Sequence, residues 1–268
     1  MAPIDLEHPR NLGGILDDAF ALYRRAYPTL LLVALVVIVP LQLLVFGVGL
    51  GWLTGPYHAT QTRTDLAVSL LQPLLAVPLV TAMTVHVVRE AAAGRDPSAR
   101  PALRAAALAA RRLLPAVALA LLGEALGFLL IIPGIVLAVR WALVSQVVVV
   151  EGEEGTGALA RSARLVAGRG WFTFGVIAVL AILVSLLGQV VLLPLDAAAR
   201  SAGHQWPALI GQTVAQVLAV PLQAVAVTLL YFSLRAEKEP AGPATPEPEI
   251  PQDPWERRQL QEGWQPPA

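Results

Sequence analysis

The chain has 268 residues, of which 56% are hydrophobic and 14% charged, and its 19 basic and 19 acidic side chains cancel to a net charge of zero. A neutral chain lacks the positive field that attracts nucleic acid, and the absence of cysteine excludes disulfides and thiolate chemistry. Apolar stretches recur over residues 28–235. Because about 20 apolar residues cross a bilayer core, this pattern predicts an integral membrane protein whose partner is the lipid bilayer.

Residues 1–27 form a polar N-terminus that ends in a predicted amphipathic helix. The helical spacing gives this helix one apolar face, made of Leu16, Phe20, Tyr23 and Tyr27. Its C-terminal end carries Arg24 and Arg25, a favourable place for positive charge in the helix dipole. We therefore expect this helix to lie at the cytoplasmic headgroup interface.

Residues 28–235 are predicted to form an all-α, polytopic membrane domain. The expected spans are 28–53, 66–88, 113–132, 134–150, 171–194 and 208–233, six transmembrane helices arranged as three hairpins. Arginines gather before the first span, between the second and third, between the fourth and fifth, and after the sixth. By the positive-inside rule, both termini are cytoplasmic and the protein is a multi-pass protein of the cell membrane. An arginine-bearing segment of helical composition precedes each hairpin, so a cytoplasmic amphipathic helix is expected there.

Residues 236–268 differ abruptly in composition, because proline and glutamate replace the aliphatic residues. Such a segment cannot bury a core and is predicted to be disordered. Within it, Trp255 and Trp264 flank a short stretch, WERRQLQEGW, that could dock on a protein partner or on the membrane surface. The alternative is an extended, solubilising tail.

The segment 131–171 resembles the integral membrane domain of some bacterial glycerophosphoryl diester phosphodiesterases, a domain that also occurs in stand-alone proteins of unassigned function. The matching positions are Pro133, Gly134, Arg140, Trp141, Glu151, Gly152, Ala158, Ser162, Leu165 and Gly168. The end of the sixth span, TLLYFSLRAEKEP, is similar to the tyrosine-containing exit helix of that family. The resemblance implies a helical membrane module of a bacterial inner membrane. In the enzymes of the family, catalysis belongs to a separate soluble barrel, for which this chain has no room, so phosphodiesterase activity is not expected.

Five polar residues in the predicted spans are candidates for an intramembrane site. Glu124 and Arg140 flank the Pro133-Gly134 turn and should reach similar depth, where they either form a structural ion pair or serve a ligand, a proton or a lipid headgroup. Three glutamines share one face of the sixth span and should point into the bundle: Gln212, Gln216 and Gln223. They either hydrogen-bond between helices or line a solute path.

The sequence contains no catalytic motif. It has no phosphate loop, no HExxH and no GxSxG, and its four histidines are too scattered for a metal site. We therefore expect no catalytic residues, no metal and no cofactor. The first hypothesis is a non-enzymatic membrane protein that scaffolds partners or organises lipid. The alternative is a carrier or channel for a small or amphipathic solute, and a lipid-active enzyme is a third, disfavoured, reading.

Overall fold

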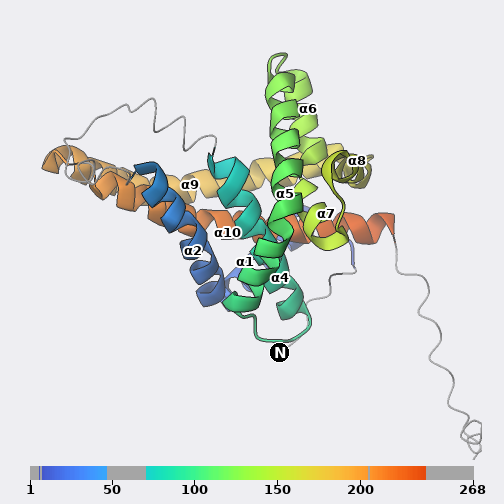
Figure 1. Ribbon diagram of the computed structural model, residues 1–268, viewed down its shortest axis with the longest axis horizontal. Helices are drawn as coiled ribbons and strands as arrows, with labels where there is room; N and C mark the ends of the chain where they lie inside the picture. Colours follow the sequence, from blue (N-terminus) through green and yellow to red (C-terminus); the bar gives the residue numbers. More distant parts are fainter. Residues whose placement is uncertain (1–5, 7, 47–70, 205, 240–268) are drawn as a thin grey trace, which may run out of the picture.

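The computed structural model describes residue 6 and residues 8–46, 71–204 and 206–239, and its regular elements are helices (Figure 1). The predicted all-α class is therefore confirmed for this part of the chain. Five of its helices are long and apolar enough to cross a membrane, or six if the bent pair at the N-terminus counts as one span. This is the composition of a multi-pass membrane protein.

The N-terminal bent pair consists of α1 (Leu12–Arg25) and α2 (Tyr27–Phe46), which meet at an angle of 84°. The Asn11 side chain caps α1 by accepting a 2.8 Å hydrogen bond from the Gly14 N–H group. The first predicted span, 28–53, coincides with α2 up to residue 46, and its remainder lies outside the described residues.

The apolar face predicted for α1 is right for Leu16 and Tyr23, which pack partly buried against the core, and wrong for Phe20 and Tyr27. The helix buries Ile15, Ala19 and Leu22, whereas Phe20 and Tyr27 are exposed. The reason is that α1 packs against the C-terminal helix α10 (Trp206–Lys238), and the small Ala19 allows a close approach on that side.

The second predicted span, 66–88, is described from residue 71 onward. It consists of a five-residue π-helix (Gln72–Ala76) that continues directly into α4 (Val77–Ala92). The helix α4 is buried on most sides because it packs between α5, α10, α2 and α7.

The third predicted span is not separate from the amphipathic helix expected before it. Residues Ala99–Phe128 form one continuous 30-residue helix, α5, although Pro115 lies inside it. Only the first and third hairpins are therefore preceded by distinct helices, α1 and α8 (Gly155–Val166).

The fourth predicted span, 134–150, is broken in two. It consists of α6 (Ile132–Trp141) and α7 (Val144–Glu151), with the break at Ala142 and Leu143. The left-handed Gly152 (φ 75°) ends α7 and turns the chain toward α8.

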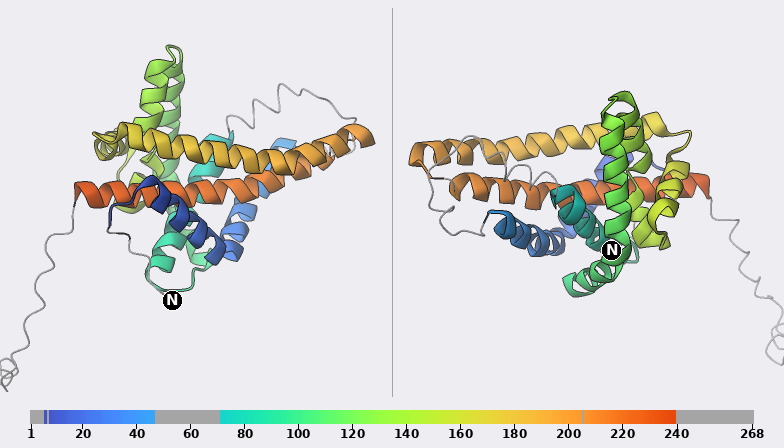
Figure 2. Two further views of the ribbon diagram at one scale, coloured as in Figure 1. Left: turned by 180° about the vertical axis from the view of Figure 1, so that it is seen from behind. Right: turned by 45° about the horizontal axis from the view of Figure 1, so that its top comes forward.

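The last hairpin is the longest element of the fold. The helices α9 (Gly170–Ala202) and α10 have 33 residues each and pack side by side. In Figures 1 and 2 the α5–α6 hairpin stands across this pair, so the helices do not form a bundle with a common axis.

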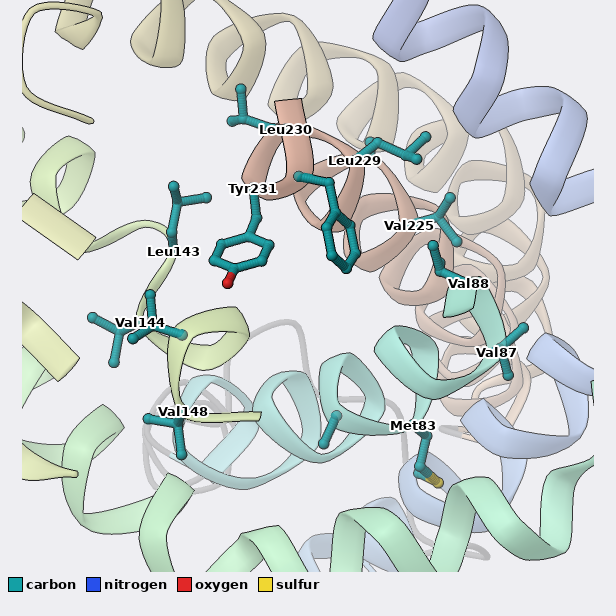
Figure 3. Close-up of a cluster of buried hydrophobic side chains, with 14 of the residues drawn as sticks. Met83, Val87, Val88, Leu143, Val144, Val148, Val225, Leu229, Leu230 and Tyr231 are labelled. Atoms are coloured by element: carbon teal, nitrogen blue, oxygen red, sulfur yellow. The ribbon is translucent and has the colours of Figure 1, made fainter. Parts of the chain in front are cut away.

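The core surrounds α10. Its C-terminal half is buried among α1, α2, α4, α8 and α9. In the close-up of Figure 3, the Tyr231 ring of α10 points toward Leu143 and Val144 of the α6–α7 region, and all three residues are buried. The centre of the fold is therefore apolar, and polar contacts gather at helix ends.

Candidate functional site

The predicted ion pair between Glu124 and Arg140 is not present in the structure. Glu124 on α5 is half-buried and Arg140 on α6 is exposed, and among the described residues neither side chain has an ion-pair partner. Their neighbours Gly123 and Trp141 occupy the interface between the two helices. Since one residue turns a helix by about 100°, Glu124 and Arg140 are both rotated away from that interface.

The three glutamines are half-buried on α10. None of them makes a side-chain hydrogen bond to another described residue. Since α10 packs chiefly on α9, α4, α1 and α2, the structure does not gather Gln212, Gln216 and Gln223 around Glu124 and Arg140. The five candidate residues therefore occupy two separate regions.

The structure instead brings polar residues together at the adjoining ends of α7, α8 and α10. Glu151 at the end of α7 accepts hydrogen bonds of 2.6 and 3.1 Å from Nε and Nη2 of Arg161 on α8. The Tyr231 hydroxyl of α10 donates a 2.7 Å hydrogen bond to the same carboxylate. Arg161 also donates from Nη2 to Glu239, at 2.6 Å. We call these four residues the α7–α8–α10 network.

A neighbouring arginine on α10 balances the charge of the network. Arg235 approaches the Glu239 carboxylate at 3.4 Å, so two carboxylates face two guanidinium groups. The hydrogen bond from Arg161 to Glu151, together with the Glu239 carboxylate, raises the pKa of the Arg161 guanidinium. The side chains of Arg161 and Glu151 are only 17% and 15% exposed, so water screens their pair less than it screens a surface pair. Such a cluster suits fastening better than ligand binding.

A second fastening joins α8 to the break between α6 and α7. The buried Ser162 hydroxyl donates a 2.8 Å hydrogen bond to the Arg140 carbonyl and accepts one of 3.3 Å from the Leu143 N–H group. Because a helix break frees backbone groups of this kind, the hydroxyl replaces partners that the helix no longer supplies.

The N-terminus is fastened to α10 in a similar way. The Arg10 N–H group donates a 2.7 Å hydrogen bond to the Ser233 hydroxyl, and the Tyr23 hydroxyl donates one of 3.0 Å to the Leu218 carbonyl. Arg169 also binds Glu237 at 2.8 Å, just before α9. Polar contacts thus hold α10 at several points between Leu218 and Glu237.

Sequence reasoning missed part of this arrangement. Glu151, Ser162 and Tyr231 belong to the positions that resemble the membrane-domain family. The contacts that they make follow from the fold and cannot be read from their spacing in the sequence. The sequence indicated Arg161 only as one of the cytoplasmic arginines, and it did not indicate Glu239. Gly123 and Gly127, four residues apart, were overlooked although that spacing is typical of close helix packing.

No group of three or more His, Cys, Asp or Glu side chains that could hold a metal occurs in the described part of the chain. Comparison of the chain with family models, curated proteins and solved structures gives no match.

Proposed function

We propose that the protein is a non-enzymatic membrane protein that organises lipid or scaffolds partners at the cytoplasmic leaflet. One row of arginines on α5 carries this proposal: Arg100, Arg104 and Arg111. All three are exposed, and their spacing places them on one helix face. Within the described residues, none of the three has a carboxylate partner. Each such cation is worth about 1 kcal/mol beside an anionic membrane surface.

The apolar core supports a scaffold over an enzyme. The helix α10 is enclosed by its neighbours. The charged side chains of the α7–α8–α10 network pair with one another. A bound reactant would require polar groups that converge and remain available. The α7–α8–α10 network offers no polar groups that remain available to a reactant.

We also propose kinship with the integral membrane domain of the bacterial glycerophosphoryl diester phosphodiesterases. The support is the sequence resemblance over 131–171, together with the contacts that Glu151 and Ser162 make at two joints of the helical framework. From this kinship we infer a fold and a membrane location for the chain, and we do not infer hydrolytic activity.

Lipid retention tests the proposed function directly. The protein is placed in nanodiscs of mixed phosphatidylcholine and phosphatidylglycerol, and bound lipids are counted by native mass spectrometry after gentle release. We expect preferential retention of phosphatidylglycerol, and a marked loss of it in the triple variant R100Q/R104Q/R111Q.

A matched control separates the arginine row from net charge. The triple variant R95Q/R169Q/R200Q removes the same formal charge, but each of these arginines already pairs with a carboxylate: Arg95 with Glu90, Arg169 with Glu237 and Arg200 with Asp196. It should retain phosphatidylglycerol nearly as well as the unchanged protein. Equal losses in both triple variants would contradict a specific role for the row.

The carrier alternative draws support from two buried polar atoms without a protein partner. These are Thr84 Oγ1 on α4 and Gln146 Oε1 on α7, two helices in contact. A solute path through this region would admit water. A cysteine at Gln146 should then react with a small, water-soluble thiosulfonate, whereas a closed core leaves it unreactive, which is the result we expect.

A further inference from the structure

The α5–α6 hairpin ends in an apolar turn with unusual exposure. Leu129 is 85% exposed and Ile132 is 73% exposed, and the intervening Leu130 and Ile131 are exposed as well. None of the other described helices covers the turn, which projects from the rest of the helices in Figures 1 and 2. In contact with water, this surface would be strongly unfavourable.

The backbone N–H groups of the turn already have hydrogen-bond partners. The N–H groups of Leu129, Leu130, Ile131 and Ile132 donate to carbonyls of the hairpin itself, at 3.3, 3.0, 3.1 and 2.6 Å. The next residue, Pro133, has no N–H group. Irregular backbone is costly in hydrocarbon because nothing there accepts its hydrogen bonds, and this turn has removed most of that cost.

The turn that joins α9 and α10 provides the contrast within the same chain. Asp196, Arg200 and Ser201 precede it, and the left-handed Gly203 (φ 69°) forms it. These polar residues are what a turn in water requires. The α5–α6 turn has no polar side chain from Phe128 to Val136.

Between its charged base and the turn, the α5 arm is shorter than the hydrocarbon core. From Arg112 to Phe128, α5 rises roughly 24 Å, less than the ~30 Å hydrocarbon core. On the returning arm, the exposed Arg140 lies only roughly 12 Å from Ile132. A full crossing would leave this lipid-facing cation near the bilayer centre, at a cost of about 2.5–3.5 kcal/mol on insertion scales. A shallow position places Arg140 and Trp141 at the headgroups, where both are favourable.

The orientation of the hairpin agrees with this. It stands across the α9–α10 pair in both views of Figure 2, and α9 and α10, with 33 residues each, are long enough to span. Two sets of helices that cross each other cannot both follow the membrane normal.

We propose that the α5–α6 hairpin is a re-entrant element, whose turn from Phe128 to Ile132 inserts among acyl chains of the cytoplasmic leaflet and does not emerge on the opposite side. By length and composition both arms qualify as spans. The closed turn, the position of Arg140 and the crossing with α9–α10 distinguish a re-entrant hairpin from a pair of spans. The inference does not depend on the proposed lipid-organising role.

Single cysteines test this, because the chain has none of its own. Leu130→Cys and, as matched control, Ser201→Cys are expressed separately and exposed to a membrane-impermeant maleimide, first in intact cells and then after permeabilisation. The control should react on one side of the membrane. Leu130→Cys should react in neither condition and become reactive only in denaturing detergent.

A fluorescent probe supplies the second measurement. A nitrobenzoxadiazole group on Leu129→Cys, in phosphatidylcholine liposomes, should emit at shorter wavelength than the same group on Ser201→Cys and be quenched by lipids that carry a nitroxide on the acyl chain. Labelling of Leu130→Cys from outside would show a complete crossing, and labelling after permeabilisation alone would place the turn in the cytoplasm. Either result would overturn the proposal.

Discussion

The Tyr231 hydroxyl donates a 2.7 Å hydrogen bond to Glu151, which joins two residues that are 80 positions apart in the chain. The ring of Tyr231 is fully buried in the core, as Figure 3 illustrates, while its hydroxyl reaches the carboxylate that Arg161 also binds. One carboxylate at the end of α7 therefore fastens both α8 and α10. The polar network closes the apolar core at one end.

Removal of that hydroxyl should destabilise the fold. Tyr231→Phe keeps the buried ring and deletes one hydrogen bond to a charged acceptor, a loss of about 1.5–3 kcal/mol. Glu151→Gln should cost more, because it also leaves the Arg161 guanidinium without its main partner. Thermal unfolding of the purified variants in detergent, followed by circular dichroism, measures both effects.

A double-mutant cycle tests whether these two residues act together. The variant Y231F/E151Q should lose less stability than the sum of the single variants, with a coupling of roughly 0.5–3 kcal/mol. The matched control is Y23F/E151Q, because Tyr23 also donates its hydroxyl proton, but to the Leu218 carbonyl. Coupling of equal size in the control would argue against a specific contact between Tyr231 and Glu151.

Glycines should limit what the α5–α6 hairpin tolerates. A Cβ atom at Gly134 would lie 2.6 Å from the Phe128 backbone, so Gly134→Ala should destabilise the protein by about 1–3 kcal/mol. At Gly188 on α9 nothing lies within 4 Å, and Gly188→Ala should be neutral or stabilising, since alanine favours a helix. The same unfolding assay compares the two.

A compensating substitution sharpens this test. A Cβ atom at Gly123 would meet the Trp141 ring at 2.5 Å. Gly123→Ala should therefore cost stability in the unchanged background and much less in combination with Trp141→Leu, because the smaller side chain leaves room. Equal costs in both backgrounds would mean that the two helices are not in close contact there.

The sequence was sufficient for the helical class and for the position of most long apolar helices of the described residues, because long runs of apolar residues indicate such helices directly. The sequence was insufficient where contacts with other helices determine the local structure. The break at Ala142 and Leu143 depends on the Ser162 hydroxyl from another helix, and the buried face of α1 depends on the approach of α10. The candidate site was harder still. Glu124 and Arg140 have a separation along the chain that would allow an ion pair between α5 and α6. The contact between Gly123 and Trp141 fills the interface between the two helices instead.

The arginine distribution predicts which ends of the helices face the cytoplasm. A cysteine at His204, next to the α9–α10 turn, should react with an impermeant maleimide in intact cells. Cysteines at Ala93 and Glu153, next to arginine-bearing segments, should react only after permeabilisation. The reverse pattern would invert the orientation, with both termini outside.

Glu124 and Arg140 should behave as independent residues. Because Arg140 is exposed and has no partner among the described residues, Arg140→Gln should change stability by no more than about 0.5 kcal/mol. Glu124→Gln should be neutral or stabilising, because it replaces a half-buried ionisable group with a neutral one of similar size. The effects of the double variant should add to within about 0.5 kcal/mol when unfolding is measured in detergent. Glu151→Gln with Arg161→Gln serves as the positive control, since those side chains do pair and their effects should not add. A double variant of Glu124 and Arg140 that loses far less stability than the sum would mean that the two side chains meet in the bilayer, and that Arg140 lies deeper than a re-entrant hairpin allows.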